Sequence, residues 1–330
     1  MKQSVPAWIS RLAVAVGIAL FGVTLLYIDR GATLREARQL GLLLPLVLLP
    51  SAAWHLLRTL GWLWCFPAAV RPTFVRLFRV RLAADAVSYF TVRGLASEPL
   101  RVVLLLDHVP APMSTAAALL ERTAMGVMSI ILVAACAIVA ISSDVLPEDW
   151  QQLFRYIAIG AVGAVLLALI LLTRRERYIG PLLERMYRRT GWRWTEGRVA
   201  RFIREVERLF LALARDDPRR LRRLVLLALV CFALMVLEVW MVFWAIDLEI
   251  SLWRSAIVET FARTASVPGG IIPASLGALE AANVSVVRAL GLSGAGSLAL
   301  ARRVRGLFWA GLGLLLYPRE TLHAHPLDSR

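Results

Sequence analysis

The sequence has few of the side chains that build metal centres and disulfide frameworks. Its 330 residues include three cysteines, four histidines and a single lysine, Lys2. The cysteines stand far apart in apolar surroundings and the histidines lack zinc-ligand spacing, so we expect neither a disulfide framework nor a metal site. No nucleotide-binding P-loop occurs in the sequence, which argues against ATP hydrolysis by this chain. We predict no cofactor.

Apolar residues dominate what is present. Hydrophobic side chains make up 59% of the sequence, and the formal net charge is +15. Soluble domains of this size are much less apolar, which places the chain among polytopic membrane proteins. Helices satisfy their own backbone groups in lipid, so the predicted fold class is an all-α membrane protein. The positive charge lies in loops between apolar runs, which argues against nucleic acid as a partner.

Six apolar runs approach or exceed the roughly 20 residues that a spanning helix requires. They are 12–28, 41–66, 113–141, 152–172, 224–246 and 298–317. The first run is not followed by a small-residue cleavage site, so we expect a retained helix and not a signal peptide. In the second run His55 and Arg58 share one helix face. Arg58 either belongs to an internal site or extends to the membrane surface.

Two further stretches, 80–110 and 251–292, are apolar but interrupted. In the second stretch the apolar halves are separated by the helix breakers 268–270, Pro273 and Gly277. Neither half is long enough to span a membrane, so we predict two half-helices that meet at an irregular turn. The second half-helix is expected to be capped by Ser275 and to carry Glu280 on its second turn. The alternative is two ordinary helices joined by a surface loop.

The segment 174–223 gives the strongest topology signal. It contains sixteen arginines and seven acidic residues, so we predict that it lies in the cytoplasm together with both termini. Apolar residues recur at helical spacing from Val199 to Leu213, which predicts an amphipathic helix. We expect this helix to bind anionic lipids of the inner leaflet; a solvated cytoplasmic hairpin is the alternative.

The order of these elements is symmetric. Residues 41–141 and 224–317 each read as a span, a broken re-entrant hairpin and a span, and the two units enter the membrane from opposite sides. We therefore predict a single membrane domain, 1–330, with about six full spans and two broken hairpins in an inverted repeat. Broken helices of such repeats meet near the bilayer midplane in many transporters.

Three short motifs resemble one protein family. They are Ser-Glu-Pro-Leu-Arg at 97–101, the pair Glu121-Arg122, and Pro-Ala-Ser-Leu-Gly-Ala-Leu-Glu at 273–280. The chain resembles the lysylphosphatidylglycerol synthetase transmembrane-domain family, which includes a flippase half of aminoacyl-phosphatidylglycerol enzymes, and it is most similar to the hopanoid-associated branch. The resemblance implies lipid translocation in a bacterial inner membrane, without the aminoacyl-transfer chemistry.

The candidate binding residues fit a charged lipid headgroup. Guanidinium groups match phosphate oxygens, and carboxylates could neutralise the arginines of an empty site or bind a cationic or hydroxylated headgroup. The candidate residues are Arg93, Glu98, Arg101, Glu121, Arg122, Pro273, Gly277 and Glu280. We expect Arg101 and Glu280 to share one central site. The alternative for each charged pair, Glu121-Arg122 above all, is a structural ion pair.

The leading functional prediction is a translocase, and not an enzyme, for a phospholipid, a hopanoid-related lipid or a polyprenyl-linked headgroup. A first alternative is an accessory membrane subunit of a lipid-modifying or glycosyltransferase system, which would have an enzyme of lipid biosynthesis as its partner. A second alternative is a membrane-embedded enzyme. The sequence disfavours it because we find neither a His/Asp cluster nor a nucleophile motif.

Overall fold

The structure is a computed structural model. It describes residues 30–90, 97–143, 145–173, 197–215 and 217–317, apart from 270, 271, 273, 274 and 276. This described part is helical and contains no strand, which confirms the all-α prediction for it. The helices are α2 (Arg30–Trp64), α3 (Phe74–Phe90), α4 (Ser97–Val103), α5 (Ala111–Ile141), α6 (Glu148–Thr173), α8 (Arg198–Arg215), α9 (Pro218–Ala245), α10 (Leu252–Gly269), α11 (Ala278–Ala289) and α12 (Ala295–Leu315).

Three of the described helices are long and apolar enough to cross a membrane. They are α5, the Glu148–Leu167 part of α6, and α9. These helices confirm the predicted runs 113–141, 152–172 and 224–246. Most of the run 41–66 lies in α2, which begins earlier, continues through Pro45 and Pro50 and ends at Trp64. The predicted first run, 12–28, lies outside the described residues.

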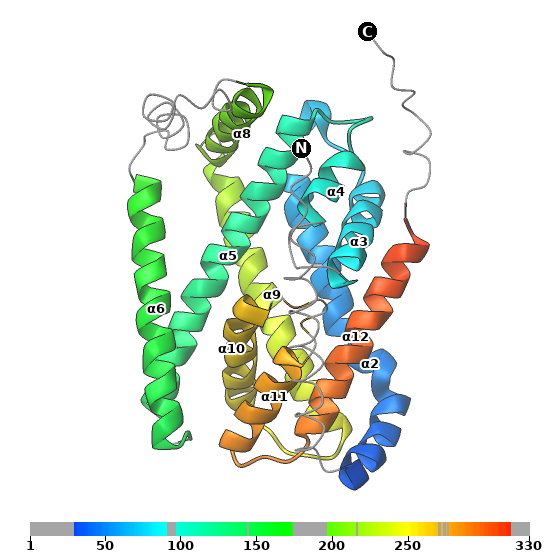
Figure 1. Cartoon of the computed structure of the whole chain (residues 1–330), viewed down its shortest axis with the longest axis vertical. Helices are drawn as coiled ribbons and strands as arrows, with labels where there is room; N and C mark the ends of the chain where they lie inside the picture. Colours follow the sequence, from blue (N-terminus) through cyan, green and yellow to red (C-terminus); the bar gives the residue numbers. More distant parts are fainter. Residues whose placement is uncertain are drawn as a thin grey trace.

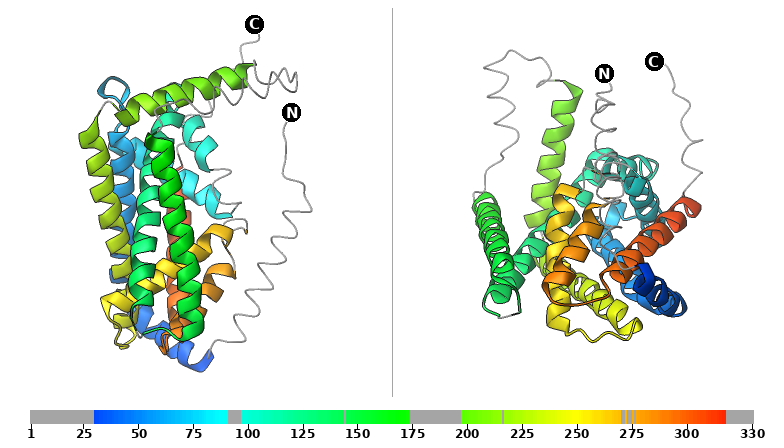
Figure 2. Two further views of the ribbon diagram at one scale, coloured as in Figure 1. Left: turned by 90° about the vertical axis from the view of Figure 1, so that its left-hand side faces the viewer. Right: turned by 60° about the horizontal axis from the view of Figure 1, so that its bottom comes forward.

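The two interrupted stretches occupy opposite ends of the bundle (Figure 1). Helices α3 and α4 lie at the end that carries α8, whereas α10 and α11 lie toward the other end. Helix α3 packs against α12, α2 against α9, and α6 against α5. Helix α8 lies across one end of the bundle (Figure 2). The longer helices thus surround the two interrupted stretches, which carry many of the polar side chains.

Helix α8 confirms the predicted amphipathic helix, but its apolar face has two environments. Val206 and Leu213 are buried in a core cluster that also contains Trp62 and Leu224. Val199 and Phe202 remain exposed on the same helix. The prediction that this face simply lies on lipid is therefore incomplete, because part of the apolar face is already buried against the bundle.

Helix α9 begins at a strong N-terminal cap. The Asp217 carboxylate accepts hydrogen bonds from the backbone N–H groups of Arg219 (2.9 Å) and Arg220 (3.1 Å), and Pro218 occupies the first helical position. The backbone hydrogen bond from Arg220 is the largest contribution that lowers the pKa of Asp217 below its ordinary value. The cap is therefore retained throughout the neutral pH range and is lost only as the pH falls through this lowered pKa.

The start of α11 differs from the prediction that Ser275 caps it. Gly277 is the N-cap, with φ +77°, a backbone conformation that glycine adopts without steric cost. Its N–H donates to the Glu280 carboxylate at 2.8 Å. Glu280 therefore lies in the first turn of α11 and not in the second. The prediction that the Ser275 hydroxyl caps this helix is wrong, because α11 begins two residues later, where the N-cap is a glycine and the Glu280 carboxylate accepts the N-cap N–H.

Small residues allow α3 and α12 to approach closely. A Cβ added at Gly313 would lie 2.2 Å from the Leu82 carbonyl oxygen, which is part of the rigid α3 backbone. We expect Gly313→Ala to force the helices apart and to lower the free energy of unfolding by about 1–3 kcal/mol, as overpacking does. Thermal unfolding in detergent measures the effect.

The matched control for Gly313→Ala is Gly311→Ala on the same helix. A Cβ at Gly311 would meet no atom within 4 Å. Alanine favours a helix over glycine, so Gly311→Ala should leave the melting temperature unchanged or raise it slightly. Equal melting temperatures for the two variants would contradict the close approach of α3 and α12.

Candidate functional site

Two groups of ion pairs lie within the described part of the bundle. The first, which we call the α3 cluster, consists of Arg58, Arg81, Asp85, Glu98, Arg101, Glu121 and Arg122. The second, the α12 cluster, consists of Glu238, Glu259, Arg263, Glu280, Arg302, Arg303 and Arg305. Ionised groups inside a membrane protein are costly unless they are paired or hydrated, so such clusters indicate a functional site or a strict structural requirement.

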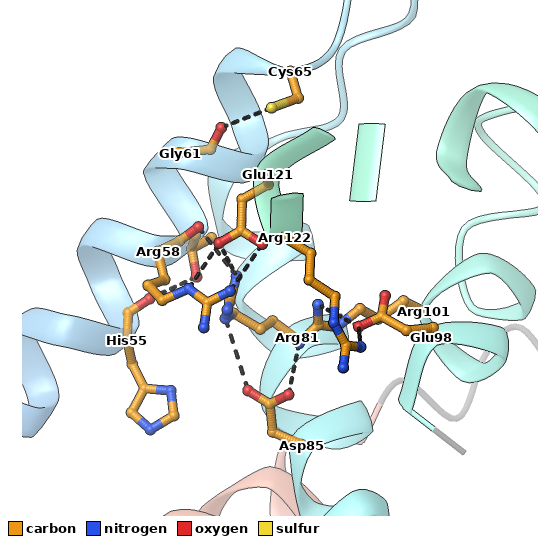
Figure 3. Close-up of polar contacts among 11 residues, drawn as sticks. His55, Arg58, Gly61, Cys65, Arg81, Asp85, Glu98, Arg101, Glu121 and Arg122 are labelled. Carbon is orange, nitrogen blue, oxygen red and sulfur yellow. Dashed lines mark hydrogen bonds and ion pairs between the residues drawn. The ribbon is translucent and has the colours of Figure 1, made fainter. Parts of the chain in front are cut away.

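Glu121 is the most deeply buried carboxylate of the α3 cluster. It accepts two hydrogen bonds from Arg58, at 2.7 and 2.9 Å, in a bidentate pair. Arg81 Nη1 lies 3.6 Å from the same carboxylate, and the side chains of both Arg81 and Glu121 are fully buried. Glu121 thereby connects α5 to α2 and α3 (Figure 3).

The other half of the α3 cluster is a chain of alternating charges. Arg101 donates to Asp85 at 2.6 Å and lies 3.5 Å from Glu98. Glu98 also accepts a hydrogen bond from Arg122 at 2.7 Å. Arg122 is the open end of this chain, since half of its side chain (51%) is exposed. Figure 3 shows these four side chains between α3, α4 and α5.

This arrangement does not contain the structural ion pair between Glu121 and Arg122 that stood as the alternative to a functional role. Consecutive residues on a helix point about 100° apart, so they rarely contact the same partner. Glu121 binds Arg58, whereas Arg122 binds Glu98. The two side chains therefore have different roles: Glu121 is enclosed by protein, and Arg122 lies at the edge of the cluster.

The α3 cluster has more positive than negative charge. Four arginines face three carboxylates, which leaves one positive charge. Three buried guanidinium nitrogens have no hydrogen-bond partner: Nε and Nη2 of Arg81, and Nε of Arg101. Arg81 Nε is 3.7 Å from Asp85, too far for a hydrogen bond. Buried donors without partners are rare, so this cluster has the capacity to bind an anion.

The α12 cluster repeats the same charge ratio. Glu259 accepts from Arg263 at 2.8 Å and from Arg302 at 2.7 Å, and Arg302 also donates to Asn283 at 2.9 Å. Glu238 accepts a hydrogen bond from Arg305. With Glu280 and Arg303, the cluster has four arginines and three carboxylates, again an excess of one positive charge.

Helix α3 contacts both clusters. Glu280 accepts from Arg303 Nε at 2.8 Å, and Arg303 donates to the Tyr89 hydroxyl at 3.0 Å. Tyr89 lies one helical turn after Asp85, the partner of Arg101, so the two side chains share one face of α3. Arg101 and Glu280 thus have different ion-pair partners, and those two clusters adjoin along α3.

A comparison with known protein families identifies the family of the whole chain. The family model described as "Lysylphosphatidylglycerol synthase TM region" matches residues 9–315. The chain belongs to this family. The match covers the three motifs on which the resemblance was based and confirms a membrane protein with a lipid-related role. No curated protein and no solved structure matches the chain significantly.

Six of the eight predicted site residues are described in this family member. Glu98, Arg101, Glu121 and Arg122 all lie in the α3 cluster. Glu280 lies in the α12 cluster, and Gly277 caps the helix that carries it. The remaining two, Arg93 and Pro273, lie outside the described residues.

Sequence reasoning missed most of the α12 cluster. Arg302, Arg303 and Arg305 lie close together within the apolar run 298–317. Charged side chains inside a spanning run normally face the protein interior, so these three arginines could have been predicted to belong to a buried polar site. Arg81, by contrast, stands close to other arginines at the start of the stretch 80–110, and only the structure shows that it is buried. Among the described residues, no group of three His, Cys, Asp or Glu side chains could hold a metal ion.

Proposed function

We propose that this member of the lysylphosphatidylglycerol synthase transmembrane family moves a lipid with an anionic, phosphate-bearing headgroup across the membrane. The observation that carries the proposal is the α3 cluster, with its excess positive charge and its buried arginine nitrogens that lack partners. A phosphate offers several acceptor oxygens and a compensating negative charge. We propose a transporter and not an enzyme.

Arg122 is the proposed first contact for the headgroup. Its exposed guanidinium can bind a phosphate from the lipid surface while it remains close to Glu98. Glu98 also lies 3.5 Å from Arg101, so a phosphate that replaced Glu98 on Arg122 would next meet Arg101 and then Arg81. Exchange of one anionic partner for another keeps the arginines neutralised at each step, which lowers the cost of moving a charge through the bundle.

The two broken stretches support an inverted-repeat mechanism. They occupy opposite ends of the bundle, and the cluster associated with each contains four arginines and three carboxylates. We propose that the headgroup passes from one cluster to the other along α3, with the acyl chains left in lipid. About six spans and two re-entrant hairpins in an inverted repeat would provide this path. Transfer along a shared helix explains why the clusters adjoin at Asp85 and Tyr89.

The lipid is proposed at the level of its headgroup. Phospholipids and polyprenyl-linked phosphates both carry the phosphate that the arginines recognise, and a hopanoid-related lipid with an anionic headgroup would bind in the same way. Assignment to the hopanoid-associated branch remains a prediction. We propose further that α8 and the segment before it bind anionic lipid through their arginines, with Val199 and Phe202 inserted.

Reconstitution into vesicles tests the proposed function. Vesicles would contain fluorescent phosphatidylglycerol on both leaflets, and dithionite would quench the outer leaflet only. We expect protein-containing vesicles to lose nearly all fluorescence, whereas protein-free vesicles lose about half. Equal quenching in the two samples for phosphatidylglycerol and for a polyprenyl phosphate would refute translocation of an anionic lipid. Activity that appears only after a partner enzyme is added would support the accessory-subunit alternative instead.

The proposed location is the bacterial inner membrane, with both termini and the segment 174–223 in the cytoplasm. We expect a cysteine introduced at Thr190 to resist a membrane-impermeant maleimide on intact cells and to react after the membrane is permeabilised. Glu148→Cys is the matched control, because this exposed residue begins α6 at the opposite end of the bundle (Figure 1). It should react on intact cells. The opposite labelling pattern would reverse the orientation.

A further inference from the structure

A cavity of about 790 Å³ opens near the connection between α9 and α10. This connection lies at the end of the bundle opposite α8 (Figure 1). The lining residues are Trp240, Trp244, Asp247, Leu248, Glu249, Ile250, Ser251 and Arg254. None of these residues belongs to the α3 or α12 cluster, so the cavity is a separate feature of the molecule.

One wall of the cavity is aromatic. The rings of Trp240 and Trp244 lie one helical turn apart with centroids 6.5 Å apart and planes at 16°. They occupy the last two turns of α9, and about half of Trp244 (48%) is exposed. Tryptophan at the end of a spanning helix is typical of the membrane interface, where lipid headgroups lie. The cavity is therefore at the depth of a headgroup.

The other walls carry charges of both signs. Asp247 and Glu249 are exposed in the short connection after α9, and Arg254 lies in the first turn of α10. The Ser251 hydroxyl accepts a hydrogen bond from the Arg254 N–H at 3.2 Å and so caps α10. The cap fixes the backbone of Arg254 at this edge of the cavity. Two carboxylates, one guanidinium and two indole rings thus line a single space.

We propose that this cavity binds the headgroup of a zwitterionic phospholipid. The ammonium group would lie against the indole faces and near the carboxylates, because tryptophan is the best cation–π partner and the carboxylates supply the opposite charge. The phosphate would bind Arg254. The inference does not rest on the proposed translocation, because binding at this end requires no passage through the bundle.

Native mass spectrometry of the full chain tests this inference directly. The protein would be mixed with equal amounts of phosphatidylethanolamine and phosphatidylglycerol that have identical acyl chains. We expect the wild type to retain phosphatidylethanolamine, and Asp247→Asn/Glu249→Gln to lower that retention about tenfold, a change on the order of 1.4 kcal/mol. Asparagine tolerates the positive φ of 56° at position 247, so the double variant should fold.

Glu148→Gln is the control, because it removes an exposed carboxylate at the same end of the bundle but outside the cavity. It should retain phosphatidylethanolamine as the wild type does. Trp244→Leu removes the exposed ring and should weaken retention of phosphatidylethanolamine. Arg254→Gln should weaken the binding of both zwitterionic and anionic lipids at this site. Unchanged retention of phosphatidylethanolamine in the double variant would overturn the proposal. Displacement of the lipid by free maltose would also overturn it, in favour of a glycan site.

Discussion

Glu121→Gln is expected to destabilise the protein severely. The substitution keeps the size of the side chain but removes the negative charge that Arg58 and Arg81 share. Arg58 would then lose its carboxylate partner, and the fully buried Arg81 would keep only the Asp85 carboxylate, at 3.7 Å. Breaking a buried ion pair in this way typically costs about 3–5 kcal/mol. We expect a large fall in melting temperature in detergent, together with poor recovery of folded protein during purification.

Arg122→Gln is the matched control for Glu121→Gln. It changes the next residue of α5, whose side chain is half exposed and contacts Glu98 only through one ion pair. An exposed pair contributes about 0–1 kcal/mol, so the melting temperature should hardly change. If Glu121→Gln were as stable as Arg122→Gln, the tertiary contacts of Glu121 with α2 and α3 would be wrong.

Glu280→Gln is expected to abolish lipid translocation while the protein stays folded. The glutamine carbonyl can still accept the N–H of Gly277, so the first turn of α11 keeps its cap. The charge that holds Arg303 is lost, however, and Arg303 keeps only the Tyr89 hydroxyl among the partners named above. Without the Glu280 carboxylate to compete for Arg303, a bound phosphate would be retained and not released. The dithionite assay measures the rate.

Glu205→Gln on α8 is the control for Glu280→Gln. Glu205 forms an ion pair with Arg208, three residues further along α8, and both side chains are well exposed. Its removal should leave translocation at the wild-type rate. A normal rate in Glu280→Gln would show that the α12 cluster is structural. A low melting temperature accompanied by normal activity of the remaining folded protein would support the same conclusion.

The sequence by itself determined the class of the protein and most of its helices. Apolar runs of spanning length lead directly to α5, α6 and α9, because lipid leaves a backbone no alternative to internal hydrogen bonds. The amphipathic pattern from Val199 to Leu213 predicted α8, because the spacing of apolar side chains along one helix is a local property of the sequence. The motifs at 97–101 and 273–280 identified the family, since each is contiguous along the chain.

Only the tertiary structure decided which charges are partners. The sequence suggested Glu121 with Arg122 because they are neighbours, whereas the fold pairs Glu121 with Arg58, 63 residues away. Likewise, Arg81 follows Arg76 and Arg79 along the chain, and nothing in that spacing distinguishes it, yet the packing of α3 buries it completely. Ion pairs form between side chains that meet in space, and helix packing, which depends on the whole chain, determines those meetings. The periodicity of one helix shows on which face of that helix a residue lies, but it does not show which residue of another helix it contacts.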